Sequence, residues 1–182
     1  MTTKKIRTPQ PYSLMKGILG QRCWSVTFAY GGELHLHFGK RIPSRIRGQN
    51  RGSWILATCG TSWVINTPHG EIVSKNHTED KLADQIKVLE RRTVSNMGFD
   101  PFTGHLWLSF DDGYAFHLTP SAEDDKCDVP YWEIFTPDNM LIAVGPRDQW
   151  SYTRSDVVPR QGSRSTSRKR SVAARRKRSK AG

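Results

Sequence analysis

Cysteine is scarce in this chain of 182 residues, and the three present, Cys23, Cys59 and Cys127, form no C-x-x-C pair. An odd number of widely separated cysteines argues against a disulfide framework. It is typical of a reducing compartment, so we expect an intracellular protein, either cytoplasmic or nuclear. Each cysteine is expected to be a small buried thiol rather than a nucleophile.

Long apolar runs are also missing, which argues against a membrane-spanning helix. The N-terminal stretch MTTKKIRTPQPYS has basic residues but no apolar segment after them, so we expect no secretory signal. The sequence contains no G-x-S-x-G, H-E-x-x-H or P-loop pattern, and its glycines are dispersed at turns. We therefore expect a non-enzymatic protein that carries no cofactor.

Positive charge, in contrast, is abundant and unevenly placed. The net charge is +11, and the segment from Pro159 to Gly182 contains ten of the 28 basic residues and no acidic residue. The rest of the chain is almost neutral, with 18 basic residues against 17 acidic ones. Because the segment has little apolar surface to bury, residues 157–182 are predicted to form a disordered basic tail.

Clustered lysine and arginine bind polyanions by releasing counterions, with little dependence on sequence. We therefore expect the tail to contact nucleic acid or another polyanion, although a merely solubilising tail is the alternative. The residues expected to make these contacts are Arg164, Arg168, Lys169, Arg170, Arg175, Arg176, Lys177, Arg178 and Lys180.

A second basic stretch, GKRIPSRIRGQNRGS, covers residues 39–53 and contains no acidic residue. A loop rich in arginine and glycine beside aromatic strands can grip phosphates, and a plain solvated loop is the alternative. Its candidate nucleic-acid-binding residues are Lys40, Arg41, Arg45, Arg47 and Arg51.

The pattern of strands predicts a mainly β (α+β) fold with an internal duplication. At an offset of 72 residues, ELHLHF aligns with HLWLSF, so that Leu34, Leu36 and Phe38 match leucines and a phenylalanine. A second alignment, at an offset of 78, places Trp54 opposite Trp132. We expect two similar antiparallel β-meander units, sandwich or barrel-like, although chance similarity of two β-rich halves would give the same pattern.

The predicted boundaries follow from this pattern. They are a flexible N-terminus at 1–13, a first β-rich repeat at 14–75, a linking helix at 76–92 and a second repeat at 93–156. Leu82, Ile86 and Leu89 occur at helical spacing in the linking segment, which predicts one amphipathic helix between the units.

Two histidines share one face of the first leucine strand. In a strand the side chains alternate, so Glu33, His35 and His37 point away from the leucines. The inner residues recur in the second copy and the outer ones do not, which favours a packing face opposite a free face. The alternative is a small metal-dependent β-barrel enzyme, because H-x-H is similar to cupin metal sites. The remaining cupin ligand, a glutamate soon after His37, is missing.

Together these features favour a non-enzymatic protein-interaction module. The basic tail would hold the protein near a polyanion, and the body would recognise an unidentified protein partner by shape. An immunity or defence protein that neutralises a protein partner is a further alternative. Among the tryptophans, Trp54 and Trp132 are expected in the core, whereas Trp63, Trp107 and Trp150 fit either the core or a recognition surface.

Overall fold

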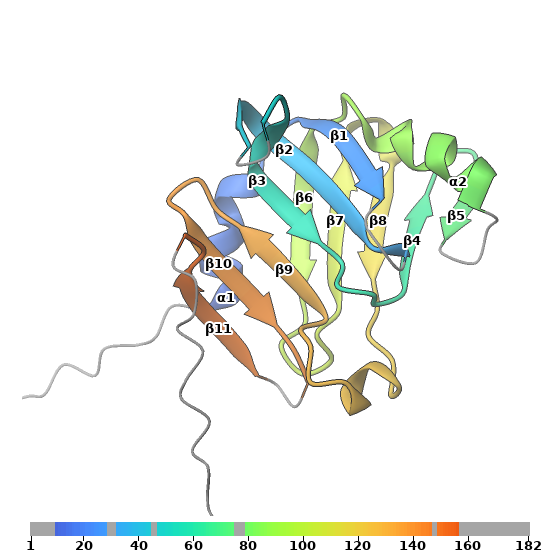
Figure 1. Ribbon diagram of the computed structural model, residues 1–182. Helices are drawn as coiled ribbons and strands as arrows, with labels where there is room; N and C mark the ends of the chain where they lie inside the picture. Colours follow the sequence, from blue (N-terminus) through green and yellow to red (C-terminus); the bar gives the residue numbers. More distant parts are fainter. Residues whose placement is uncertain (1–9, 29–31, 45–46, 75–78, 147–148, 157–182) are drawn as a thin grey trace, which may run out of the picture.

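The computed structural model describes residues 10–28, 32–44, 47–74, 79–146 and 149–156. These residues form a mainly β structure of two antiparallel sheets that pack face to face, with short helices at the periphery (Figure 1). The predicted fold class is thus confirmed at the level of a β-rich fold. The N-terminal residues 1–9, Arg45 and the whole basic tail lie outside the described residues.

One sheet has six strands and the other has five. The first has the order β1-β2-β3-β9-β10-β11, with the bounds Cys23–Phe28, Leu34–Pro43, Asn50–Ala57, Trp132–Phe135, Met140–Val144 and Trp150–Arg154. The second has the order β5-β4-β8-β7-β6, with the bounds Ile72–Ser74, Trp63–Asn66, Ala115–Leu118, Leu106–Phe110 and Val94–Phe99. The described strands form no closed barrel, which corrects the barrel-like alternative.

Each leucine strand is preceded by a short helical segment. The first is α1 (Pro11–Met15), which starts with a proline at its first turn and continues as a 3₁₀ turn, Lys16–Ile18. The second is α2 (Glu79–Gln85), followed by the 3₁₀ turn Ile86–Leu89, inside the range where the sequence predicts the linking helix. Among the described residues, no helix has the length and apolar character needed to cross a bilayer.

The core lies between the two sheets and is built from the inner side chains of the leucine strands. Leu34, Leu36 and Phe38 are fully buried. Phe38 of β2 stacks on Phe110 of β7, with ring centroids 6.4 Å apart, so the sheets meet through the residues that the alternating pattern predicts. Burying one leucine or phenylalanine side chain contributes about 1.5–3 kcal/mol, which makes this layer the main source of stability.

The prediction of two separate meanders is wrong in one respect, because each sheet takes strands from both halves of the chain. Strand β4 pairs with β8, and β9 pairs with β3. Strands β3, β4, β8 and β9 are interior strands with a neighbour on each side. Pairing across the two halves satisfies the backbone N–H and C=O groups that each half alone would leave free along one edge.

The two halves share a tryptophan hydrogen bond and its surrounding motif, which the sequence alignment placed in a different register. The indole Nε1 of Trp63 donates to the carbonyl oxygen of Gly32 at 3.3 Å, and that of Trp132 donates to Gly104 at 2.8 Å. The common motif is W-x-I-x-T-P, at an offset of 69 residues. The structure thus matches Trp132 with Trp63, whereas the sequence alignment had matched it with Trp54.

The halves also meet each other symmetrically where their first strands begin. Arg22 and Thr93, which lie 71 residues apart, form an isolated antiparallel bridge with each other. Just before them, Gly20 and Arg91 have positive φ angles of 74° and 71°. Each of these residues ends a 3₁₀ turn and redirects the chain into its strand, so the same turn is built twice.

Candidate functional site

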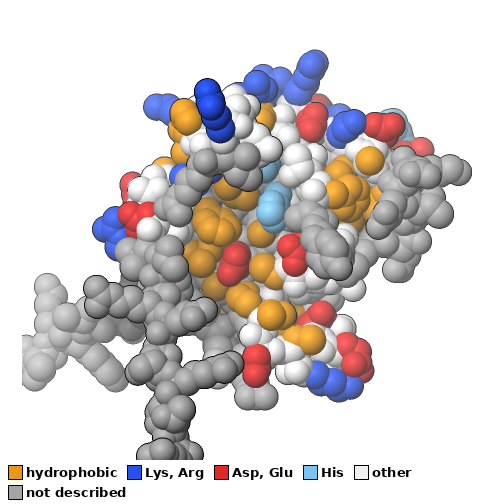
Figure 2. Space-filling view, viewed as in Figure 1, with side chains coloured by type: hydrophobic (Ala, Val, Ile, Leu, Met, Phe, Trp, Pro, Cys, Tyr) orange, Lys and Arg blue, Asp and Glu red, His pale blue; other side chains and the backbone are white. Residues whose placement is uncertain are grey.

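The outer face of the six-stranded sheet carries a row of partly exposed side chains. His37 of β2 pairs with Ile55 of β3, Ile55 pairs with Phe135 of β9, and Phe135 pairs with Leu141 of β10. All four are half-buried. Figure 2 views this face and shows histidine amid hydrophobic side chains, and in Figure 1 no described helix crosses it.

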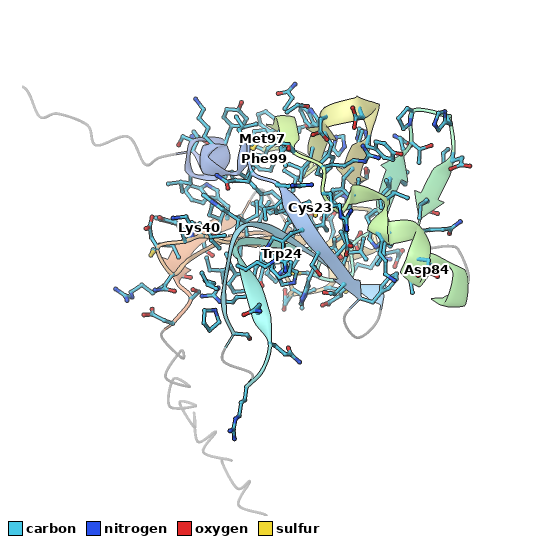
Figure 3. The ribbon with its side chains drawn as sticks, turned by 90° about the horizontal axis from the view of Figure 1, so that it is seen from above. Cys23, Trp24, Lys40, Asp84, Met97 and Phe99 are labelled. Carbon is cyan, nitrogen blue, oxygen red and sulfur yellow. The ribbon has the colours of Figure 1, made fainter. Side chains whose placement is uncertain are left out.

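Trp24 joins this row because of a β-bulge in β1. Cys23 pairs with Phe38 and Ser25 pairs with His37, which leaves Trp24 as the extra residue. The ring of Trp24 lies 5.5 Å from that of His37. In Figure 3 Trp24 and Lys40 lie toward one side of the molecule, away from Met97 and Phe99 of β6 in the other sheet.

A cation completes this aromatic cluster. The guanidinium of Arg41 lies over the Trp24 ring, 4.5 Å from its centroid. Arg41 reaches this position through a second bulge, between Phe38 and Arg41 of β2, at which Gly39 has a positive φ of 73°. We call Trp24, His37 and Arg41 the stacking cluster.

His37 is held in one protonation state by its surroundings. The backbone N–H of Gly52 donates to Nδ1 of His37 at 3.1 Å, so the imidazole accepts at this nitrogen and carries its proton on Nε2. Burial lowers the pKa of His37 to about 4, and the charges of His35 and Arg51 act in the same direction. His37 is therefore a neutral ring at neutral pH, with Nε2–H available as a donor.

The opposite end of β2 is acidic. Glu33 precedes the strand, and Glu133 of β9 faces outward beside Ala57. Burial raises the pKa of Glu133, and the charge of Glu33 raises it further. The outer face is thus polarised along the strands, because the cations of the hairpin lie on one side of the row and the carboxylates on the other.

The basic stretch 39–53 forms the end of the β2–β3 hairpin, which projects from the body in Figure 3. The side chains of Lys40, Arg41 and Arg47 are exposed, and Arg51 is half-buried. None of the salt bridges found among the described residues includes any of these four cations. They are therefore available for an external anion.

The metal candidates do not come together as a ligand set. The rings of His35 and His37 lie 6.4 Å apart, and Nδ1 of His37 is already used by Gly52. Among the described residues, no group of three or more histidine, cysteine, aspartate or glutamate side chains is placed to hold a metal ion. Glu33, His35 and His37 therefore do not form such a group in the described part of the chain.

Neither Cys23 nor Cys59 has an activated thiolate, and Cys127 is exposed, which corrects the expectation that each cysteine is buried. Burial raises the pKa of Cys23 to about 12. The pKa of Cys59 is also raised to about 12 by burial, with Glu133 and Glu33 adding to the effect. Both thiols stay protonated at neutral pH, which makes them weak nucleophiles.

The other sheet carries a different cluster on its outer face. His105 lies 5.4 Å from Trp107 and 5.7 Å from His117, measured between ring centroids. The Trp107 ring covers Gly98, where an added Cβ would come within 1.7 Å of it. This tryptophan therefore packs against its own sheet.

A cleft of about 310 Å³ lies at the edge of the six-stranded sheet, lined by Val129, Pro130, Pro146 and Trp150 among others. Trp150 also lines a neighbouring cleft of about 330 Å³, beside Phe99 and Phe102. Of the tryptophans left open by the sequence, Trp63 is a core residue, and Trp150 is partly buried and packs against the core while lining both clefts.

Sequence reasoning named seven of the residues at this surface and missed the most informative one. Strand alternation places Glu33, His35 and His37 there, and charge singles out the basic residues of the hairpin, namely Lys40, Arg41, Arg47 and Arg51. Trp24 follows from neither, because its outward position depends on a bulge that no residue pattern announces. Comparisons of the chain with protein-family models, with curated proteins and with solved structures found no match.

Proposed function

We propose that this protein is a non-enzymatic nucleic-acid-binding module whose basic tail contacts phosphates without reading the base sequence. The observation that carries the proposal is the segregation of charge. Residues 159–182 contain ten basic and no acidic residues, whereas the remaining chain is close to neutral. Such a segment releases condensed counterions when it binds a polyanion.

The β2–β3 hairpin supports the same function from within the folded body. Lys40, Arg41, Arg47 and Arg51 form no ion pair among the described residues. A projecting hairpin with free cations can follow a phosphate backbone, and its contacts would add to those of the tail.

The test compares the full chain with a variant in which the nine tail residues named above are replaced by glutamine. A second variant, with the tail arginines replaced by lysine, keeps the charge and serves as the control. Binding to a labelled duplex is followed by fluorescence anisotropy at several salt concentrations. If all nine side chains reach phosphates, the plot of log K against log salt has a slope of about −8.

We expect the lysine control to retain this salt dependence and the glutamine variant to lose most of it. Equal affinity of the glutamine variant and the natural chain would show that the tail does not bind. Absence of binding by the natural chain at low salt would refute the function altogether.

We infer further that the two halves arose by duplication and then diverged on their outer faces. The shared W-x-I-x-T-P motif and the matching indole hydrogen bonds of Trp63 and Trp132 support this. At the 71- and 72-residue offsets of the first two strands, the counterparts of Trp24 and His37 are Ser95 and Ser109. The stacking cluster therefore belongs to one face only.

A protein partner for the body stays a prediction, as do the alternatives of a defence protein and of a metal-dependent enzyme that uses His35 and His37. The intracellular location also stays a prediction.

A further inference from the structure

We propose that the stacking cluster Trp24, His37 and Arg41 binds an unpaired nucleobase, so that the folded body selects single-stranded nucleic acid. This inference rests on the proposed function and deepens it. The tail would bind the phosphates of any nucleic acid, and the cluster would add a contact with an unpaired base that a duplex cannot make.

The first support is the shape and chemistry of the cluster. Trp24 is a large flat ring on the outer face, and Arg41 stacks on it at 4.5 Å. Bases stack on aromatic rings and on guanidinium planes, and every base has such a face. A base can therefore lie on the exposed plane of Arg41 or beside the ring of Trp24.

His37 adds a neutral ring and a hydrogen-bond donor. Because Nδ1 accepts from Gly52, the proton sits on Nε2, and the structure gives that N–H no acceptor among the described residues. The ring centroid lies 5.5 Å from that of Trp24. A base stacked on the cluster is thus within reach of one donor for its edge.

The second support is the placement of charge around the cluster. Lys40, Arg47 and Arg51 lie on the hairpin beside it, and Glu33 and Glu133 lie on the side of the row away from the hairpin. Phosphates are attracted to the hairpin and repelled from the acidic end. The backbone of a bound strand would therefore follow the hairpin, with its bases directed onto the sheet.

The row of Ile55, Phe135 and Leu141 continues the platform from the cluster across β3, β9 and β10, with Glu133 in the adjacent row on the side away from the hairpin. These side chains are half-buried and carry no charge. A second unpaired base can lie on them without desolvating a charged group. A phosphate would find no cation among these three side chains. In a duplex both faces of each base are already stacked, so double-stranded nucleic acid has no surface to offer this row.

The experiment measures binding of the full chain to labelled single-stranded RNA, single-stranded DNA and duplex DNA, each about 20 nucleotides long to exceed one binding site. Arg41→Lys keeps the charge but removes the planar guanidinium, and Arg154→Lys, at an exposed position on β11 outside the hairpin and the tail, is the matched control. Trp24→Ala removes the ring, and Phe102→Ala is the aromatic control because Phe102 is 82% exposed and belongs to another turn. A thermal melt of each variant verifies folding.

We expect Trp24→Ala and Arg41→Lys to weaken single-strand binding about tenfold, since one stacked base is lost in each case. Duplex binding should change less than about twofold, because the tail is intact. The two control variants should bind like the natural chain. If Trp24→Ala fails to fold, Arg41→Lys decides the matter alone.

Unchanged single-strand affinity in Arg41→Lys, or equal loss toward duplex, overturns the inference while leaving the proposed function intact. If the natural chain binds no nucleic acid, both proposals fall together. The RNA and DNA arms identify the sugar, since binding of RNA alone would point to contacts with the 2′-hydroxyl and binding of both to stacking alone.

Discussion

A single backbone N–H fixes the tautomer of His37. Gly52 donates to Nδ1, and a protonated imidazole has no lone pair left to accept that bond. Protonation of His37 would therefore break the contact and place a charge on a half-buried ring close to the cation Arg51. Burial is the main cause of the lowered pKa of His37, and the charges of His35 and Arg51 add to it, so the ring is kept in the neutral form that can stack.

This arrangement predicts a pH-dependent stability. Because the pKa of His37 falls from 6.5 to about 4 on folding, the unfolded chain binds more protons between these values, and the free energy of unfolding decreases as the pH falls through this range. The lowered pKa values of His35 and His117 act in the same direction, whereas the raised pKa of Glu133 opposes them. Urea denaturation at a series of pH values should show a shallower decline in His37→Gln. An unchanged pH profile in that variant would contradict the assignment.

At the scale of elements, bulges decide which side chains reach the outer face. The alternating pattern of ELHLHF is sufficient to predict the buried side of β2, and the same pattern predicts β7. It does not predict Trp24 on the surface, because the bulge adds a residue and shifts the alternation. Nor does it predict that β9 pairs with β3. That pairing depends on which strand edges of the two halves are still unpaired when the sheets assemble.

The β2–β3 hairpin depends on a glycine at position 52. An added Cβ there would come within 2.7 Å of the backbone nitrogen of Phe38, so the two strands must separate. We expect Gly52→Ala to lower the free energy of unfolding by about 2 kcal/mol and to weaken the contact with His37. Gly145→Ala is the control, because its nearest neighbour would lie at 3.6 Å, an ordinary contact. Chemical denaturation compares the two, and equal stabilities would refute the steric argument.

At the scale of the whole molecule, the interleaving of strands couples the two halves. Each sheet contains strands from both halves of the chain, and the buried side chains of both sheets form one core. Neither half can keep its sheet when the other unfolds, because β3 would lose β9 and β8 would lose β4. We therefore expect the described part of the chain to unfold as a single cooperative unit.

This coupling predicts how the two matched tryptophans respond to substitution. Trp63→Phe and Trp132→Phe each remove an indole donor to a glycine carbonyl, which is part-buried at Gly32 and buried at Gly104, and leave that acceptor without its indole partner. Each change should cost about 1–3 kcal/mol. Because the halves share both sheets, either substitution should shift the same single unfolding transition, followed by circular dichroism and by tryptophan fluorescence. Two separate transitions, with each substitution affecting only one of them, would show that the halves fold independently despite their exchanged strands.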